Sequence, residues 1–315
     1  MKKTLRFYCF AAIGILFILL FSCSMKRESI GSHNKIIVVA DSTVWAAVQD
    51  ELKAALERIT YTPQPEPIFT LLQKNPDELN RITRLPNILI LGELQSQGEM
   101  KKLLDKLLSK ESVARIEKDE AFLFQKKDAW ALDQMLAVMA SRDVETLKKN
   151  ILEQSDKIFD VFDAFNESKT FRTIFSQLEQ KDLESTLMSE HGWSVRVPHD
   201  YHVAVDSSEL RYVWLRRFSP QRWFSAYWEQ VDDPSVLSKE WLLQKRAAFV
   251  KEFYDGDYVY QDTLITVREK VVDFDGRYAI RLDGVWQNDK HVMGGPFRTY
   301  GFYNESDARI YLLDI

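Results

Sequence analysis

Lys35-Ile36-Ile37-Val38-Val39-Ala40-Asp41 is the stretch from which the fold of the N-terminal half can be predicted most directly. Five consecutive apolar residues between two charged ones are typical of a strand that is buried on both faces, as in parallel sheets covered by helices. Polar residues that can cap a helix follow, and apolar residues then recur at helical spacing from Val44 to Ile59. The stretch therefore predicts a buried strand followed directly by a helix.

Strands and helices continue to alternate through the N-terminal half of the chain. This alternation indicates an α/β sandwich with a mixed sheet. We assign residues 35–190 to this domain, which ends in long helices, and place its boundary between residues 165 and 192, where Gly192 is suited to end the last helix. The predicted strands are Ile68–Leu72, Ile88–Leu91, Phe122–Gln125 and Met135–Ala140, and the predicted helices are Glu99–Leu108, one beginning near Val144 and one from Lys169 to Leu187.

The C-terminal half, residues 191–315, is rich in aromatic residues and contains six of the eight tryptophans. Its short apolar segments are typical of strands, and Asp275-Gly276 is a two-residue hairpin signal. We predict an antiparallel sheet packed by a helix over Ser238–Tyr254, so the whole chain is of the α+β class. The predicted strands are Trp193–Val197, Tyr212–Phe218, Trp223–Gln230, Thr263–Val272, Arg277–Trp286, Phe297–Tyr303 and Arg309–Leu313.

A segment of different character precedes both domains. Three of the first six residues are basic, residues 7–21 carry no charge, and the small Ser22 stands directly before Cys23. A basic start, an apolar run and a small residue before a cleavage point are typical of a secretory signal peptide. The apolar run is shorter than the roughly 20 residues that a membrane-spanning helix needs. We therefore predict a signal peptide over residues 1–22 and a flexible tether over residues 23–34.

Leu20-Phe21-Ser22-Cys23 resembles the lipobox of bacterial lipoproteins. In that family the cysteine becomes the first residue after cleavage and carries the lipid. The resemblance implies that Cys23 is acylated, with palmitate among its acyl chains, and that it anchors the protein to a membrane of the cell envelope. The implied location is the outer membrane, with the protein on its periplasmic or surface face. An uncleaved membrane anchor and an ordinary signal peptide with an incidental cysteine are the alternatives.

Charge and cysteine content exclude several classes of protein. The chain has 42 basic and 47 acidic residues, and removal of the signal peptide leaves 39 against 47, a net charge of −8. Nucleic-acid-binding proteins usually have a strong basic excess, so we expect no nucleic acid as a partner. Cys9 leaves with the signal peptide and Cys23 is assigned to the anchor, which excludes a disulfide and a cysteine nucleophile.

The sequence contains no recognisable catalytic motif. A nucleophile elbow, a zinc-binding histidine pair, a phosphate-binding loop and a dinucleotide fingerprint are all missing from it. His199 and His202 would point to opposite faces of a strand, which is unsuited to shared metal ligation. Asp273-Phe-Asp-Gly276 lacks the glutamate that a calcium loop needs at its twelfth position and is interpreted as a turn. We therefore predict no catalytic residue, no metal site and no cofactor.

Arginines interleaved with aromatic residues between Arg211 and Trp228 form the best candidate for a binding groove. Such a mixture can stack on sugars, although the aromatic residues can equally form a core stripe while the arginines pair with acids. The stretch Met293–Phe297 contains two glycines and is compatible with a backbone-lined pocket or with a wide hairpin connection. The candidate groove residues are Trp214, Arg216, Trp223, Trp228, Trp286, His291, Gly294 and Gly295.

Segments from both halves together resemble a family of uncharacterised bacterial lipoproteins that is defined only as a domain of unknown function. The similarity covers nearly all of the chain after Cys23. It implies a location, an architecture and a further short segment after the last predicted strand, but no activity, ligand or catalytic residue. The segments that carry it are Lys35–Asp41, Asn87–Leu91, Gly192–Pro198, Trp214–Arg217 and, most specifically, Gly276–Ala279, Gly284–Trp286 and Met293–Phe297.

The sequence as a whole predicts a lipid-anchored cell-envelope protein that binds or scaffolds. The expected partners are the membrane, through Cys23, and an envelope protein or a glycan. Two other functions stay open: a hydrolase that uses carboxylates, for which the 47 acidic residues offer many candidates, and a glycan-binding protein.

Overall fold

The computed structural model describes residues 26–61 and 64–315, so Cys23 and the predicted signal peptide lie outside the described residues. The described chain forms two compact units. The first comprises the residues up to Glu57 together with Phe69–Asn166, and the second comprises Arg58–Ile68 and Glu167–Ile315. The division falls inside the helix α7 (Ser155–Ile174), within the predicted interval of 165–192 but before residue 190.

A five-stranded mixed sheet forms the centre of the first unit, as predicted. Its strand order is β4-β1-β5-β7-β6, and only β6 is antiparallel to its neighbour. The four apolar residues Ile36–Val39 are at most 5% exposed, because both faces of β1 are covered. The strands are β1 (Lys35–Val39), β4 (Thr70–Lys74), β5 (Asn87–Glu93), β6 (Leu123–Lys127) and β7 (Met135–Ser141).

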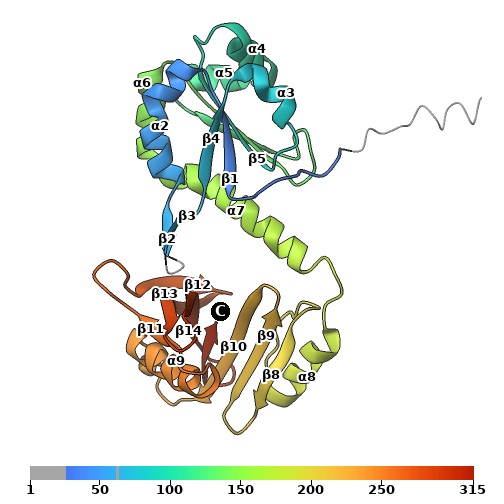
Figure 1. The fold of residues 1–315 in the computed structure, drawn as a ribbon, viewed down its shortest axis with the longest axis vertical. Helices are drawn as coiled ribbons and strands as arrows, with labels where there is room; N and C mark the ends of the chain where they lie inside the picture. Colours follow the sequence, from blue (N-terminus) through green and yellow to red (C-terminus); the bar gives the residue numbers. More distant parts are fainter. Residues whose placement is uncertain (1–25, 62–63) are drawn as a thin grey trace, which may run out of the picture. The chain divides into compact units, whose positions relative to one another are not determined.

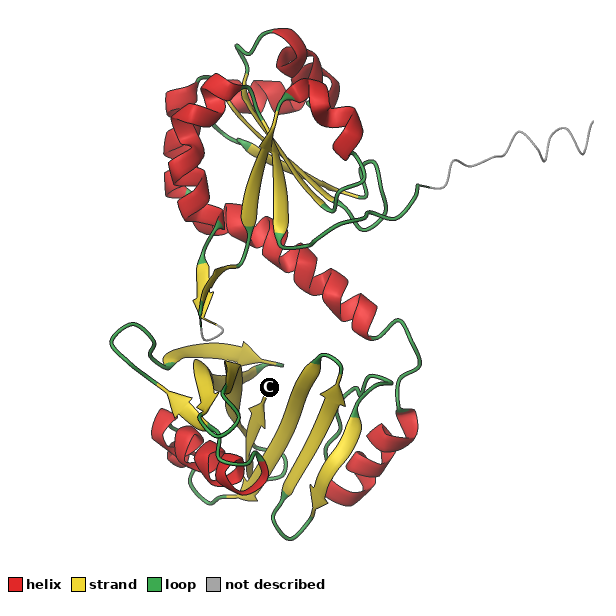
Figure 2. Cartoon of the chain, viewed as in Figure 1, coloured by secondary structure: helices red, strands yellow, loops and turns green. Residues whose placement is uncertain are grey.

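Helices cover both faces of this sheet, with α2 and α6 on one face and α3, α4 and α5 on the other (Figures 1 and 2). Local capping fixes where two of them begin, since the side chains of Ser109 and Asp143 accept hydrogen bonds from the backbone of α5 and α6. A hairpin of β2 (Ile59–Tyr61) and β3 (Pro65–Pro67) follows α2. The helices are α2 (Ser42–Leu56), α3 (Leu79–Ile82), α4 (Gly98–Leu107), α5 (Lys110–Glu117) and α6 (Val144–Glu153).

The segment before β1 is hydrogen-bonded to the first unit. The Ser29 N–H donates to the Leu132 carbonyl at 2.9 Å, and the Leu132 N–H donates to the Arg27 carbonyl at 2.9 Å. The Ile30 N–H donates to the Arg84 carbonyl at 2.8 Å. The prediction of a flexible tether is therefore wrong for residues 27–30, where the backbone finds partners in the folded unit.

An antiparallel sheet of eight strands dominates the second unit, again as predicted. Its order is β11-β13-β14-β15-β10-β9-β8, and β12 also pairs with β13 (Figure 1). Asp275 and Gly276 both have positive φ, as the two-residue hairpin between β12 and β13 requires. The strands are β8 (His202–Ser207), β9 (Tyr212–Phe218), β10 (Gln221–Gln230), β11 (Tyr258–Tyr260), β12 (Arg268–Phe274), β13 (Arg277–Asn288), β14 (Met293–Asn304) and β15 (Arg309–Asp314).

Two hydrophobic clusters lie on this sheet. One joins α9 (Lys239–Phe253) to β9, β10, β13, β14 and β15 through residues such as Leu242, Tyr212 and Phe297. The other joins α8 (Lys181–His191) to the sheet through Leu187 and Trp228. Within residues 26–61 and 64–315, none of the helices combines the length and apolar character needed to cross a bilayer.

Three secondary-structure predictions for the second unit were wrong. Trp193–Val197 is not a strand, because the Val197 N–H is bonded to the Glu184 side chain instead of to a ladder. The predicted helix Lys169–Leu187 is interrupted at residues 175–180 between α7 and α8. Met293–Pro296 is the beginning of β14 and not a hairpin connection, since it pairs with β13. The strand β8 was not predicted.

Gly301 of β14 lets α9 pack directly on the sheet. A Cβ atom at this position would lie 2.6 Å from Leu242 Cδ2 and 2.8 Å from Leu237 Cδ1. We expect Gly301→Ala to lower the free energy of unfolding by about 1–3 kcal/mol through overpacking. Urea titration followed by tryptophan fluorescence measures this loss. Leu242→Ala removes two of the crowded atoms, so the two substitutions together should cost less than their sum, and strict additivity would contradict the explanation.

Candidate functional site

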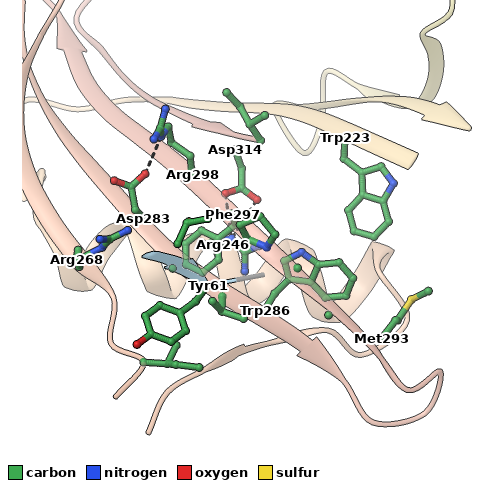
Figure 3. A pocket seen from close by; sticks show the side chains of 18 of the residues that line it. Tyr61, Trp223, Arg246, Arg268, Asp283, Trp286, Met293, Phe297, Arg298 and Asp314 are labelled. Atoms are coloured by element: carbon green, nitrogen blue, oxygen red, sulfur yellow. Dashed lines mark hydrogen bonds and ion pairs between the residues drawn. The ribbon is translucent and has the colours of Figure 1, made fainter. Parts of the chain in front are cut away.

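A cavity opens in the second unit beyond the last residues of β15. Within the ladder, Asp314 pairs with Ser225 of β10 and with Thr299 of β14. Past this row, Gln221–Phe224 pair with β9 alone and Met293–Phe297 pair with β13 alone. The cavity is lined by residues of both stretches and has a volume of about 750 Å³ (Figure 3), which is a usual size for a small-ligand site.

A buried ion pair forms the floor of the cavity. Arg246 Nε of α9 lies 3.0 and 3.1 Å from the two carboxylate oxygens of Asp314, and both side chains are more than 90% buried. The Thr299 hydroxyl donates to the same carboxylate. Arg246 Nη1 is buried and has no hydrogen-bond partner in the described part of the chain. The guanidinium therefore has a donor that the folded unit leaves unused.

An aromatic ring holds the Arg246 side chain in place. The guanidinium carbon lies 3.9 Å from the centroid of the Phe297 ring, a cation–π contact in a buried environment. Phe297 occupies the space above Gly284, where a Cβ atom would approach the ring to 2.5 Å. Gly284 is therefore required for the position of Phe297, and through it for the position of Arg246.

Two tyrosines lie behind the ion pair. The hydroxyls of Tyr212 and Tyr254 are 2.9 Å apart and share a hydrogen bond. Burial raises the pKa of Tyr212 to about 12, so its hydroxyl stays neutral at physiological pH. Both residues border a small void with Arg246 and Asp314. The floor of the cavity is thus a polar group of residues set into the aromatic core.

One wall of the cavity is aromatic. The rings of Trp223 and Trp286 are stacked with centroids 5.6 Å apart, and Met293 lies beyond Trp286 (Figure 3). Trp214 supports Trp223 from behind in an edge-to-face contact at 5.8 Å. Gly295 permits this arrangement, because a Cβ atom there would lie 3.1 Å from the Trp286 indole nitrogen.

Arginines outnumber acids around the cavity, where four arginines and two aspartates line the walls. Asp314 is held by Arg246, and Asp283 by Arg298 at 2.7 Å and by Arg281 at 2.9 Å. The guanidiniums of Arg222 and Arg268 have no acidic partner among the described residues. The cavity therefore has a positive charge surplus in a chain whose net charge is negative.

The structure brings together half of the residues predicted for a groove. Trp223, Trp286, Gly294 and Gly295 line the cavity, and Trp214 packs behind its wall. The three others lie elsewhere. Arg216 lies over the rings of Trp214 and Phe218, Trp228 belongs to the cluster at α8, and His291 pairs with Asp255 at 2.6 Å.

Sequence reasoning missed Arg246, Asp314, Phe297 and Arg268 as members of this site. Arg246 lies on a helix with a hydrophobic pattern, and the other three lie on strands whose pairing register cannot be read from a local pattern. The stretch Met293–Phe297 was noted for its glycines, and this signal did lead to one wall of the cavity. The only sequence feature that could have indicated Arg246 is its position as a charged residue within the apolar face of α9.

One group of side chains elsewhere could approach a metal ion. Ligand atoms of Glu190, His191 and Asp206 lie within 4.8 Å of one another. His191 Nε2 already bonds to Asp206 at 2.8 Å, and its ring lies against Trp228. The bond to Asp206 and the contact with Trp228 explain why His191 is buried without a metal ion: it is part of the core around α8.

Comparison with protein families matches both halves of the chain to families without an assigned function. Residues 29–175 match a domain of unknown function (DUF8532), and residues 179–315 match another (DUF4837). The two matches are consistent with the predicted resemblance to an uncharacterised family, although they are two separate domains where one family was expected. No curated protein shows significant similarity to the sequence.

Proposed function

We propose that the protein is a lipid-anchored binding protein of the cell envelope, and that the cavity of its second unit is the binding site. The observation that carries this proposal is the combination of unpaired arginines and an aromatic wall in one cavity of about 750 Å³. Arginine guanidiniums recognise carboxylates and phosphates, and indole rings supply apolar surface. A ligand that has both an anionic group and an apolar part fits this combination.

The state of the two cavity aspartates supports binding over hydrolysis. A hydrolase that uses carboxylates needs one acid to donate a proton and another to accept one. Asp283 is bonded to two arginines, and Asp314 is bonded to Arg246 and Thr299. Both carboxylates thus act as partners of fixed cations.

The same contacts argue against a neutral glycan as the ligand. Sugar hydroxyls require acceptors as well as donors, and carboxylates usually supply them. In this cavity the carboxylates are already occupied, whereas Arg246 Nη1 and the guanidinium of Arg268 lack partners within the described ranges. The cavity therefore offers donors in excess of acceptors, which favours an anion.

The location rests on the N-terminal segment. The run of apolar residues and Leu20–Cys23 support attachment of the mature protein through a lipid on Cys23. We propose that this anchor holds both units at the surface of an envelope membrane. Cleavage before Cys23 would leave a chain with a net charge of −8, in which the arginines around the cavity form a local positive surplus.

A pair of fluorescent probes tests the binding proposal. Anilinonaphthalene sulfonate and phenylnaphthylamine have similar ring systems, but only the first is an anion. We expect the anionic probe to bind more tightly and to change the emission of Trp223 and Trp286. Arg268→Gln should weaken its binding by roughly three- to tenfold, as expected for loss of one partly exposed cationic contact.

Arg277→Gln serves as the matched control, because Arg277 is a paired arginine of the β12–β13 hairpin outside the cavity. This variant should bind the anionic probe like the unchanged protein. Equal affinity for the anionic and the neutral probe, or equal losses in the two variants, would refute a cavity selective for anions.

A further inference from the structure

One face of the sheet in the second unit carries a concentration of basic side chains. Along β12, β13 and β14 the side chains alternate between two faces, and the face of Ile280 and Leu282 is buried in the cluster with α9. The opposite face holds four cations and one acid in two neighbouring rows. The first row is Lys270, Arg281 and Tyr300, and the second row is Arg268, Asp283 and Arg298. We refer to the four cations as the basic face.

The basic face is open toward β12. The buried cluster around α8 lies on the same side of the sheet and reaches β14 at Phe302, which packs on Tyr311. Closer to β12, Lys270 is exposed, and Phe274 and Tyr300 are half-buried. The Phe274 ring is stacked on Phe302 at 4.8 Å and lies 5.3 Å from the Tyr300 ring. The open part of this face thus combines cations with an aromatic surface.

The single acid on this face is already paired. Asp283 lies 2.9 Å from Arg281 Nη2 and 2.7 Å from Arg298 Nε. Lys270 stands directly opposite Arg281 and has no acidic partner among the described residues. Arg281 Nε is buried and also lacks a hydrogen-bond partner there. Like charges that oppose each other in a sheet lower stability, so this pair of cations is expected where it serves binding.

We propose that the basic face docks on the headgroups of an anionic lipid membrane. This inference rests on the membrane anchor in the proposed function and adds a second contact with the same membrane. The chain after cleavage has a net charge of −8, so an anionic surface repels it except where cations gather. Each cation near such a surface adds to binding, and tyrosine is favoured where its ring is apolar and its hydroxyl is wet.

The exposure of the side chains favours a membrane over an acidic protein segment. A protein interface usually has an apolar core that the partner covers. Here Lys270 and Arg268 are exposed, whereas Phe274 and Phe302 are half-buried against each other. The cations are therefore the groups that a partner meets first. Lipid phosphates are mobile and adjust to cations at any spacing, so they need no apolar core.

Chemical modification of lysines tests the proposal with the complete lipid-anchored protein. The protein is reconstituted in vesicles of phosphatidylcholine, or of phosphatidylcholine with phosphatidylglycerol, and treated with a membrane-impermeant acetylating reagent. We expect Lys270 to react roughly three- to tenfold more slowly in the anionic vesicles, and high salt to remove this protection. Lys251 is the control, because it is exposed on α9, and it should react equally in both kinds of vesicle.

A charge reversal separates docking from a structural role. Lys270→Glu places an acid opposite Arg281 and should raise the urea midpoint of unfolding, because an attractive cross-strand pair replaces a repulsive one. We expect energy transfer from tryptophan to dansyl-labelled lipid to be greater in anionic than in neutral vesicles, and Lys270→Glu to lose this excess. Lys251→Glu changes the net charge equally and should keep it. A lower urea midpoint in Lys270→Glu would contradict the repulsive pair.

The outcomes distinguish this inference from the proposed function. Equal acetylation of Lys270 in both kinds of vesicle, or equal loss of energy transfer in the two variants, would overturn docking and leave the anchor standing. Protection that arises only in native envelope membranes, and in neither kind of vesicle, would assign the face to a protein partner and overturn the lipid. A protein that does not stay with the vesicles at all would remove both the anchor and the docking face.

Discussion

Asp314→Ala is expected to lower the free energy of unfolding of the second unit by about 3–5 kcal/mol, because it leaves a buried arginine without its counter-charge. Arg246 and Asp314 are both more than 90% buried and lie 3.0 Å apart. The Phe297 ring lies 3.9 Å from the guanidinium carbon and holds the cation in place beside the carboxylate. Urea titration monitored by tryptophan fluorescence measures the loss, because six of the eight tryptophans belong to this unit.

A double-mutant cycle identifies the cause. Arg246→Met and Asp314→Leu together remove both charges and keep most of the volume, so the double variant should recover most of the stability lost in Asp314→Ala. Arg277→Ala with Asp275→Ala removes an exposed ion pair and should change stability by less than about 1 kcal/mol. A loss in the Asp314→Ala variant no larger than in this surface control would contradict a buried pair.

Cys23→Ala is expected to abolish lipid attachment completely. The thiol is the only group in Leu20–Cys23 that can form a thioether with a lipid. Cells grown with radioactive palmitate should label the unchanged protein and leave the variant unlabelled, and the variant should fractionate as an unprocessed precursor. Loss of the lipid should also release the protein from the membrane, because each buried methylene group of an acyl chain contributes about 0.8 kcal/mol to membrane binding.

Cys9→Ala is the matched control for this experiment. Cys9 is the only other cysteine and lies within the apolar run of the predicted signal peptide. Its replacement should leave processing and labelling unchanged. Labelling that persists in Cys23→Ala but disappears in Cys9→Ala would show that Cys9 and not Cys23 carries the lipid. An unchanged protein without label would remove the anchor from the proposal.

The elements with a strong local pattern were predictable from the sequence. Ile36–Ala40 and Met135–Ala140 are apolar throughout because both faces of their strands are buried. These continuous apolar runs made it possible to predict the strands of the first sheet. Gly192 was assigned to the end of a helix, and it has a φ of 78° there, which glycine adopts without strain. These features depend on neighbours in the sequence.

Features that depend on distant pairing were not predictable. His202–Ser207 has mixed polarity, and it becomes a strand because β9 offers an edge with which it can pair. Met293–Pro296 contains two glycines and a proline, which disfavour a strand, but β13 continues alongside and pairs with it. The walls of the cavity follow from such pairings, because residues of β10, β13 and β14 that lie far apart in the sequence line it together.

With the proposed lipid on Cys23, the hydrogen bonds that hold residues 27–30 to the first unit would limit the height of the protein above a bilayer. From Cys23 to Arg27 the chain advances four residues, and a fully extended chain spans at most about 3.6 Å per residue. The segment between a lipid on Cys23 and the folded unit would therefore be a tether of at most about 14 Å, close to half the thickness of the hydrocarbon layer. The proposed anchor would therefore keep the first unit at headgroup level, and the protein would meet membrane-resident molecules more often than molecules that diffuse through the aqueous compartment.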